Sequence, residues 1–249
     1  MESPHGAAVA AEDLGLEGPR GRVFRNVTFS AEPGALVAIE GPSGSGRTCL
    51  LLALTGRMRT TEGHARTGGL RLPKQAAAVR GIAALGPVPG VSELDPAFTV
   101  AEHLNERALL QGRYGASLRT LLRPRAERRA AAGALIDEAL EAAGLDLATL
   151  PKSGRTSVRD LERLEALRLS VALALTGKPR LLAVDDTDLK LSDAERDQAW
   201  ALLRSVAGSG TTVLAVCSEA PEDTLAVRTA PATTIDEETA DAHPEAGRA

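Results

Sequence analysis

The chain is poor in aromatic residues, cysteine and lysine. Aromatic residues make up 2% of its 249 residues, and its two cysteines are Cys49 and Cys217. Two cysteines far apart in apolar surroundings are not the framework of a disulfide-rich secreted domain, so we expect buried free thiols in a reducing compartment. Arginine greatly outnumbers lysine, a bias that a GC-rich genome would produce and that weakens functional arguments from any single arginine.

Long apolar runs and an excess of positive charge are also absent from the sequence. No run approaches the roughly 18–20 apolar residues that a membrane-spanning helix needs. The first residues show no basic region followed by an apolar stretch, so we expect no secretion signal. The net charge of −4 gives no electrostatic case for a nucleic-acid partner. With 43% hydrophobic and 25% charged residues, the composition is that of an ordinary globular chain.

Residues 41–48 have the pattern of a phosphate-binding loop. They match Gly-x-x-x-x-Gly-Lys-Ser/Thr except that arginine replaces the lysine, and in order they are Gly41, Pro42, Ser43, Gly44, Ser45, Gly46, Arg47 and Thr48. The apolar run 35–39 predicts a buried strand before the loop, and residues 49–54 predict a helix after it. Glycines let backbone N–H groups converge at a helix N-terminus, which suits a chain of phosphates. The alternative, a surface loop that matches by chance, is disfavoured by this flanking pattern.

Strands alternate with helices along the rest of the chain, which predicts a parallel sheet covered on both faces. We expect residues 1–21 to form a partly disordered N-terminal segment, residues 22–230 a nucleotide-binding domain, and residues 231–249 a solvated acidic tail. Within the domain the predicted strands are 23–30, 35–39, 81–85, 181–184 and 212–216, with a small antiparallel hairpin at 61–72. The predicted helices are 126–143, 157–176 and 192–207, and the block 101–176 is typical of an inserted helical subdomain.

The apolar strand 181–184 ends in two carboxylates, Asp185 and Asp186. An aspartate delivered beside a phosphate loop supports Mg²⁺ together with the hydroxyl of Thr48. A second carboxylate one residue later can polarise an attacking water. Polar strand ends are common, so the motif alone is weak. Its order after the phosphate loop and the helical block favours a metal site.

Together these motifs resemble the nucleotide-binding subunits of ATP-binding cassette (ABC) transporters over about residues 23–227. Residues 61–63, 98–104 and 177–186 are similar to the family's glycine turn, the start of its helical subdomain and the approach to its magnesium strand. The resemblance implies an α/β fold of the P-loop NTPase class: an ABC-type nucleotide-binding domain with a parallel-sheet core, an antiparallel hairpin region and an inserted helical subdomain.

The resemblance also implies a set of ligands and partners. ATP would bind at residues 41–48, Thr48 and Asp185 would hold Mg²⁺, and Asp186 would be the catalytic base. Family members work as head-to-tail pairs, so a second nucleotide-binding subunit is implied, identical or different. An integral membrane transporter subunit would hold this cytoplasmic protein peripherally at the inner face of the cell membrane.

Several positions depart from the family pattern, at places where the resemblance implies contacts to the γ-phosphate or to Mg²⁺. Counting back from the magnesium strand, the signature Leu-Ser-Gly-Gly-Gln falls on residues 161–165, where Glu162 and Glu165 would repel phosphate. The family's glutamine falls near Pro87, and its histidine falls on Ser218.

The remaining departures concern the catalytic base and the loop itself. Asp186 is one methylene shorter than the usual glutamate, and a displacement of about 1 Å can cost on the order of a hundredfold in rate. Arg47 keeps the charge of lysine but is a longer planar fork, which could still bind phosphate bidentately. The combined changes predict impaired hydrolysis.

Two functions therefore stay open from the sequence. The chain is either the energy-coupling ATPase subunit of a transporter, or a non-catalytic regulatory or structural cassette that pairs with a competent ATPase or a membrane protein. A different phosphate-loop enzyme such as a kinase is disfavoured, because no phosphate-acceptor site is visible and the resemblance over 61–104 would be unexplained.

Overall fold

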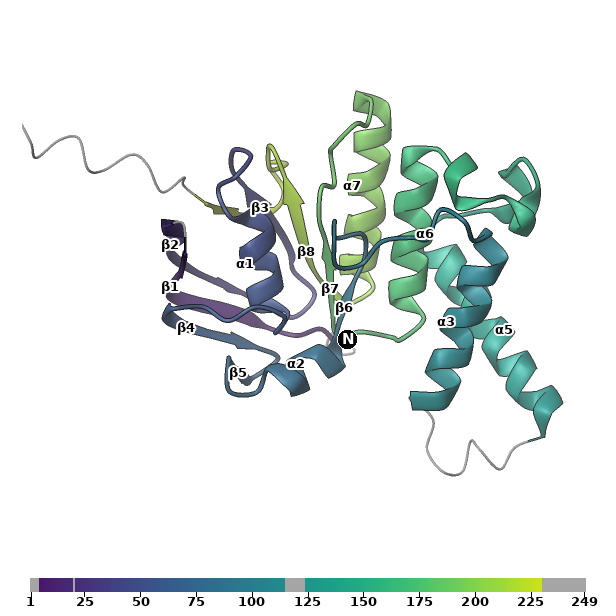
Figure 1. Cartoon of the computed structure of the whole chain (residues 1–249), viewed down its shortest axis with the longest axis horizontal. Coiled ribbons are helices and arrows are strands. Elements are labelled where there is room, and N and C mark those ends of the chain that lie inside the picture. The colour runs from purple at the N-terminus through teal and green to yellow at the C-terminus, as the bar shows by residue number, and fades with distance from the viewer. Residues whose placement is uncertain (1–4, 20, 115–123, 230–249) are drawn as a thin grey trace, which may run out of the picture.

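The computed structural model describes residues 5–19, 21–114 and 124–229. They form an antiparallel sheet, a parallel sheet and a group of helices, which follow one another across the molecule in Figure 1. The proposed acidic tail lies outside the described residues. Within the described part of the chain, no helix is both long enough and apolar enough to cross a membrane.

The parallel sheet has the strand order β6-β7-β8-β3-β9. Its strands are β3 (Leu36–Glu40), β6 (Ala83–Leu85), β7 (Leu181–Val184), β8 (Thr212–Cys217) and β9 (Leu225–Arg228). β7 and β8 are buried along their whole length, in keeping with their uninterrupted apolar sequences. β3, β7 and β8 confirm predicted strands, whereas the sequence does not predict β9, which is short and mostly exposed.

The antiparallel sheet has the order β2-β1-β4-β5. Its strands are β1 (Val9–Gly18), β2 (Gly21–Ala31), β4 (Glu62–Thr67) and β5 (Leu70–Leu72), so the predicted hairpin at 61–72 is confirmed. Within the segment 1–21, expected to be partly disordered, residues 9–18 are ordered as β1, which pairs with both β2 and β4. Val9 and Leu14 of β1 are buried, but the alanines and acidic residues between them are weak strand formers and hide the pattern.

Six α-helices lie in the described residues. They are α1 (Arg47–Leu54), α2 (Ala76–Ile82), α3 (Val100–Tyr114), α5 (Arg125–Ala142), α6 (Arg163–Leu175) and α7 (Asp193–Gly208), with three 3₁₀ turns at Leu147–Thr149, Ser153–Arg155 and Val158–Asp160. In Figure 1, α3, α5 and α6 form the helical subdomain at the end of the molecule opposite the antiparallel sheet. The block 101–176 thus contains the predicted helical insertion.

Two helix or strand boundaries differ from prediction. The helix predicted at 157–176 begins only at Arg163, because the residues before it pair elsewhere: the Val158 N–H donates to the Phe98 carbonyl at 2.9 Å. The strand predicted at 81–85 begins at Ala83, because α2 continues to Ile82.

The core lies on both faces of the parallel sheet, since successive residues of a strand point to opposite sides. On one face Leu182 packs with Trp200 of α7, and on the other Leu181 packs with Leu50 of α1. Phe24 of β2 is also buried in the second core, 1% exposed. Burial of such side chains holds α1, and with it residues 41–48, against the sheet.

Candidate functional site

The site lies where the carboxyl ends of three parallel strands meet. β3, β7 and β8 are adjacent in the sheet and end at Glu40, Val184 and Cys217. Residues 41–46 connect β3 to α1, whose first residue is Arg47. Ligands of open parallel sheets bind at this edge, beyond the carboxyl ends of the strands. Strand, glycine loop and helix are therefore arranged as the sequence predicts.

Two glycines of the loop are in backbone conformations and at contacts that other residues would not tolerate. Gly41 has φ 153°, and a Cβ there would lie 2.6 Å from the Thr229 carbonyl oxygen. Gly46 has φ 83°, and its Cβ would lie 2.8 Å from the Val23 carbonyl oxygen. The loop is thus fitted closely between β9 and β2, and the exposed residues 42–44 form its tip.

The hydroxyl of Ser45 is committed to the protein itself. Ser45 is fully buried, and its Oγ lies 2.7 Å from the Oγ1 of Thr229, in a hydrogen bond. The Thr229 N–H in turn donates to the Glu40 carbonyl at 3.0 Å. The phosphate loop therefore rests on the segment after β9, a support that the sequence pattern does not reveal.

Thr48 and Asp185 come together as the two motifs predict. The Thr48 hydroxyl donates a hydrogen bond of 2.7 Å to Asp185 Oδ2. Asp185 is 1% exposed, and burial raises the pKa of its carboxyl, while the hydrogen bond from Thr48 acts in the opposite direction. A hydroxyl and a carboxylate at this distance suit Mg²⁺, which takes one or two protein ligands and completes its shell with phosphates and water.

No group of three or more His, Cys, Asp or Glu side chains in the described residues could hold a metal ion by itself. The donor set at Thr48 and Asp185 fits a metal that arrives with a phosphate ligand, and it does not fit an all-protein cage of the zinc type.

Asp186 follows Asp185 in a left-handed backbone conformation, with φ 49°. Aspartate tolerates this region better than most residues. The Asp186 N–H donates to Asp185 Oδ1 at 2.9 Å, and the guanidinium of Arg163 lies 3.5 Å from the Asp186 carbonyl oxygen. The turn after β7 is thus held from two sides, and Asp186 lies half-exposed at the edge of the site.

Arg47 does not extend freely into the loop. Its guanidinium donates to the carbonyl of Cys217, the last residue of β8, and the side chain is half-buried. The positive charge of Arg47 still acts on the site, since it slightly opposes the rise in the pKa of Asp185. The arginine that replaces the pattern's lysine is therefore also a structural link between the phosphate loop and β8.

The positions of the missing family glutamine and histidine are used for backbone contacts. The Pro87 carbonyl accepts a hydrogen bond from the Asp185 N–H at 2.9 Å. The Ser218 N–H donates to Asp188 Oδ2 at 2.7 Å, which joins the loop after β8 to the loop after β7. Pro87 has no polar side-chain group in place of the family's glutamine, and at Ser218 a short hydroxyl side chain replaces the family's histidine.

Glu40 is a residue of the site that motif analysis misses. Its carboxylate pairs with Arg228 and accepts a hydrogen bond of 2.9 Å from the Ala220 N–H, and the contact with Arg228 holds its pKa below the ordinary value. A charged residue that ends the apolar strand β3 is the signal that could have marked it.

The start of α6 carries the two glutamates that replace the family signature. The Glu162 N–H donates to Glu165 Oε2 at 2.9 Å, and both residues belong to a capping box. Carboxylates stabilise a helix N-terminus through its dipole. The same charges repel a phosphate group, so this helix start is unsuited to an anionic ligand.

Comparison with known proteins agrees with this geometry. Residues 24–188 match the ABC transporter family. The Nod factor export ATP-binding protein I of Paraburkholderia xenovorans is 32% identical over 196 residues, which cover 77% of this chain and 56% of that protein. The protein of the same name from Ralstonia nicotianae is 30% identical over 219 residues, covering 86% of this chain and 62% of that protein. The chain thus spans somewhat more than half the length of these relatives.

Solved structures of the same kind share the fold. The dimeric ATP-binding cassette MJ0796 bound to ADP and Pi superposes with a TM-score of 0.64 at 21% identity, covering 85% of this chain and 88% of that one. An ATP-bound bacterial Atm1-family ABC exporter superposes with a TM-score of 0.63 at 22% identity, covering 88% of this chain and 35% of that one. The P-loop NTPase fold of the ABC type, expected from the sequence, is confirmed. The chain belongs to the ABC transporter family and is one of its ATP-binding cassettes.

Proposed function

We propose that this chain is the ATP-binding subunit of a membrane transport complex, that it binds Mg·ATP at residues 41–48, and that it hydrolyses ATP poorly. The observation that carries the proposal is the pairing of Thr48 with Asp185 at 2.7 Å beside a glycine loop at the edge of a parallel sheet. This pair supplies the oxygen ligands for Mg²⁺, and the loop supplies backbone N–H groups for the phosphates.

In this proposal each residue has one task. The backbone of residues 41–48 cradles the phosphates, with Arg47 contributing charge from its place beside β8. Thr48 and Asp185 hold Mg²⁺, which when bound neutralises charge on the phosphates. Asp186 orients and polarises the attacking water.

Weak hydrolysis follows from what surrounds this pair. The carboxylate of Asp186 is one methylene shorter than the usual glutamate. Arg47 is held by the Cys217 carbonyl, so phosphate must compete with that contact for its donors. The backbone N–H of Ser218 already donates its hydrogen bond to Asp188. Each feature removes or diverts a group that would act on the γ-phosphate. Small displacements of such groups lower the rate of hydrolysis strongly.

A non-catalytic regulatory or structural cassette is the second function, and the start of α6 favours it. If the chain pairs head-to-tail with another cassette, Glu162 and Glu165 would face the partner's nucleotide and repel it. In a pair of identical chains, both nucleotide sites would then bind ATP poorly. We therefore propose that the partner is a different, competent cassette.

The membrane partner and location follow from the family. An integral membrane subunit would recruit the chain to the cytoplasmic face of the cell membrane. Relatives are called Nod factor export proteins, and for this chain an export complex of unspecified substrate is the corresponding proposal.

Calorimetric titration with Mg·ATP, with phosphate release followed in the same samples, tests the proposal. The wild type should bind with little release, and Asp186→Asn should remove what release there is. Arg47→Lys should raise release if the arginine limits it. Glu162→Ser/Glu165→Gln, mixed with a competent cassette, should raise release if the glutamates block the second site. Absence of ATP binding in both wild type and Arg47→Lys would reject nucleotide binding, and rapid release by the isolated wild type would reject impairment.

A further inference from the structure

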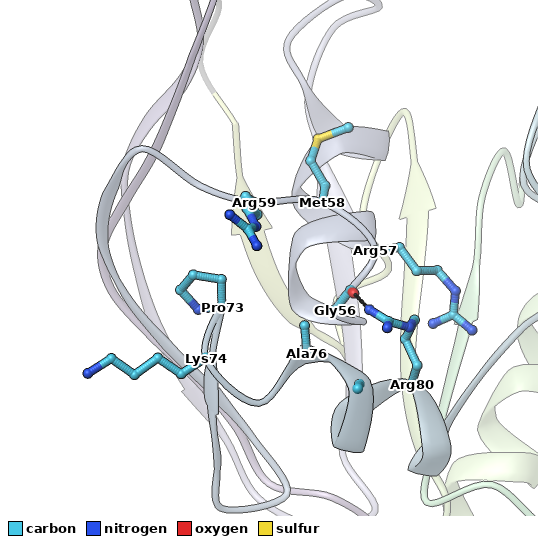
Figure 2. A pocket seen from close by; sticks show the side chains of 9 residues that line it. Gly56, Arg57, Met58, Arg59, Pro73, Lys74, Ala76 and Arg80 are labelled. Carbon is cyan, nitrogen blue, oxygen red and sulfur yellow. Dashed lines mark hydrogen bonds between the residues drawn. The ribbon is translucent and has the colours of Figure 1, made fainter.

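A cavity lies at the other end of α1 from the phosphate loop. It is lined by residues 56–59, which follow α1, and by residues from the segment after β5 and the first turns of α2, and its volume is about 330 Å³ (Figure 2). That volume lies at the small end of the range for ligand pockets, about 300–1,000 Å³. Because α1 has eight residues, the cavity and the phosphate loop are separated by about 12 Å of helix.

All the charged residues that line this cavity are positive. Four of its residues are cationic, Arg57, Arg59, Lys74 and Arg80, and the others are glycine, alanine, proline and methionine. No aspartate or glutamate lines it. Among the described residues, ion pairs form at four other places, and none of them includes these four cations. The chain as a whole is acidic, so a cavity with this lining is a local reversal of charge.

Two of the cations have backbone partners. Arg57 donates to the carbonyls of Thr55 at 3.0 Å and Ala83 at 3.2 Å, and Arg80 donates to the carbonyl of Gly56 at 2.8 Å. In Figure 2 the Arg57 and Arg80 side chains lie on the same side of the end of α1. Burial, and secondarily the charge of Arg80, lowers the pKa of Arg57, as expected for two cations without a counter-charge.

Stabilisation of the C-terminal end of α1 explains only two of the four cations. Cations near a helix C-terminus interact favourably with its dipole, which accounts for the contacts of Arg57 and Arg80 with Thr55 and Gly56. It does not account for Arg59 and Lys74, whose exposed side chains make no hydrogen bond within the described residues. In Figure 2 the Arg59 side chain lies on the opposite side of the cavity from Arg80, and Lys74 extends from the outer rim.

We propose that this cavity binds a phosphate group carrying two or more negative charges. Guanidinium groups bind phosphate bidentately, and each offers five N–H donors, of which Arg57 and Arg80 use few for the backbone. A multiply charged anion would relieve the repulsion between Arg57 and Arg80 and would also attract Arg59 and Lys74. The phosphate belongs either to a soluble phosphorylated molecule or to a phospholipid headgroup, and neither depends on ATP binding at residues 41–48.

Arg59→Gln/Lys74→Gln is the test variant, because both side chains are exposed and neither makes a hydrogen bond whose loss would unfold the chain. The matched control is Arg22→Gln/Lys152→Gln, which removes one exposed arginine and one exposed lysine elsewhere. Arg47→Gln serves as a third variant, since it marks binding at the phosphate loop. The full chain is titrated with inorganic pyrophosphate by calorimetry. It is also sedimented with phosphatidylcholine vesicles that contain or lack phosphatidic acid.

We expect the test variant to weaken pyrophosphate binding at least about tenfold, the loss of one charge-assisted contact, and the control to leave it within twofold. Binding only to vesicles with phosphatidic acid, again lost in the test variant, supports the site with a lipid as its source. The proposal is overturned if neither probe binds, if the test variant binds as the wild type does, or if Arg47→Gln alone abolishes binding. None of these results bears on ATP turnover.

Discussion

The guanidinium of Arg47 donates a hydrogen bond to the backbone carbonyl of Cys217 and thereby joins the phosphate loop to the end of β8. Arg47→Ala leaves the carbonyl of the buried Cys217 without this donor, so we expect the free energy of unfolding to fall by about 1–2 kcal/mol. Urea unfolding measures this loss. Arg47→Lys keeps a donor and should lose less. Equal stability of Arg47→Ala and wild type would show that the contact contributes nothing.

Removal of the Thr48 hydroxyl should destabilise the buried carboxylate of Asp185. Thr48→Val keeps the shape but not the donor, and we expect a loss of about 1 kcal/mol at neutral pH. The donor opposes the rise in the pKa of Asp185, so the loss should shrink as the pH falls from neutral through the raised pKa of the folded carboxyl, which lies above the ordinary value of 3.8. Thr48→Ser, which keeps the hydroxyl, is the control. A loss that does not change with pH would contradict the assigned cause.

Alkaline unfolding should depend on Cys217. Burial raises the pKa of this thiol from 9.0 to about 12 in the folded chain. Between these two values the unfolded chain has released the proton and the folded chain retains it, so stability must fall as the pH rises through this window. Below the lower value the contribution of the thiol is constant. Denaturant unfolding of wild type and Cys217→Ala across the window should give a shallower fall for the variant, and parallel curves would refute the prediction.

The N-cap of α7 should contribute to stability independently of the nucleotide site. The Ser192 hydroxyl accepts from the Glu195 N–H, and the Glu195 carboxylate accepts from the Ser192 N–H at 2.8 Å, the two sides of a capping box. We expect Ser192→Ala to cost about 1 kcal/mol in thermal or urea unfolding, with ATP binding unchanged. Ser192→Asp supplies another cap and should recover most of that loss. If it does not, the hydroxyl acts through something other than capping.

The sequence predicts well the elements that are defined by patterns of adjacent residues. Continuous apolar runs predict β3, β7 and β8 because strands buried on both faces need no polar positions. The glycine pattern predicts the shape of residues 41–48, and the carboxylates after β7 predict the approach of Asp185 to Thr48. In each case a few adjacent residues carry the whole signal.

Contacts between distant segments are what the sequence does not predict. β1 contains few strong strand formers and exists because β2 and β4 pair with it on both sides. The start of α6 moves to Arg163 because Val158 pairs with Phe98. Likewise no local pattern indicates that Cys217 would accept from Arg47 or that Thr229 would support Ser45.

The contact between Ser45 and Thr229 has a consequence for synthesis on the ribosome. The two residues are 184 positions apart, and Thr229 follows the last strand of the sheet. At about 5–20 residues per second, the loop leaves the ribosome roughly 10–40 s before its support is made. During that interval the nascent chain contains the whole phosphate-binding sequence without the strand that braces it. The first motif to be translated is thus among the last parts of the molecule to reach its final form.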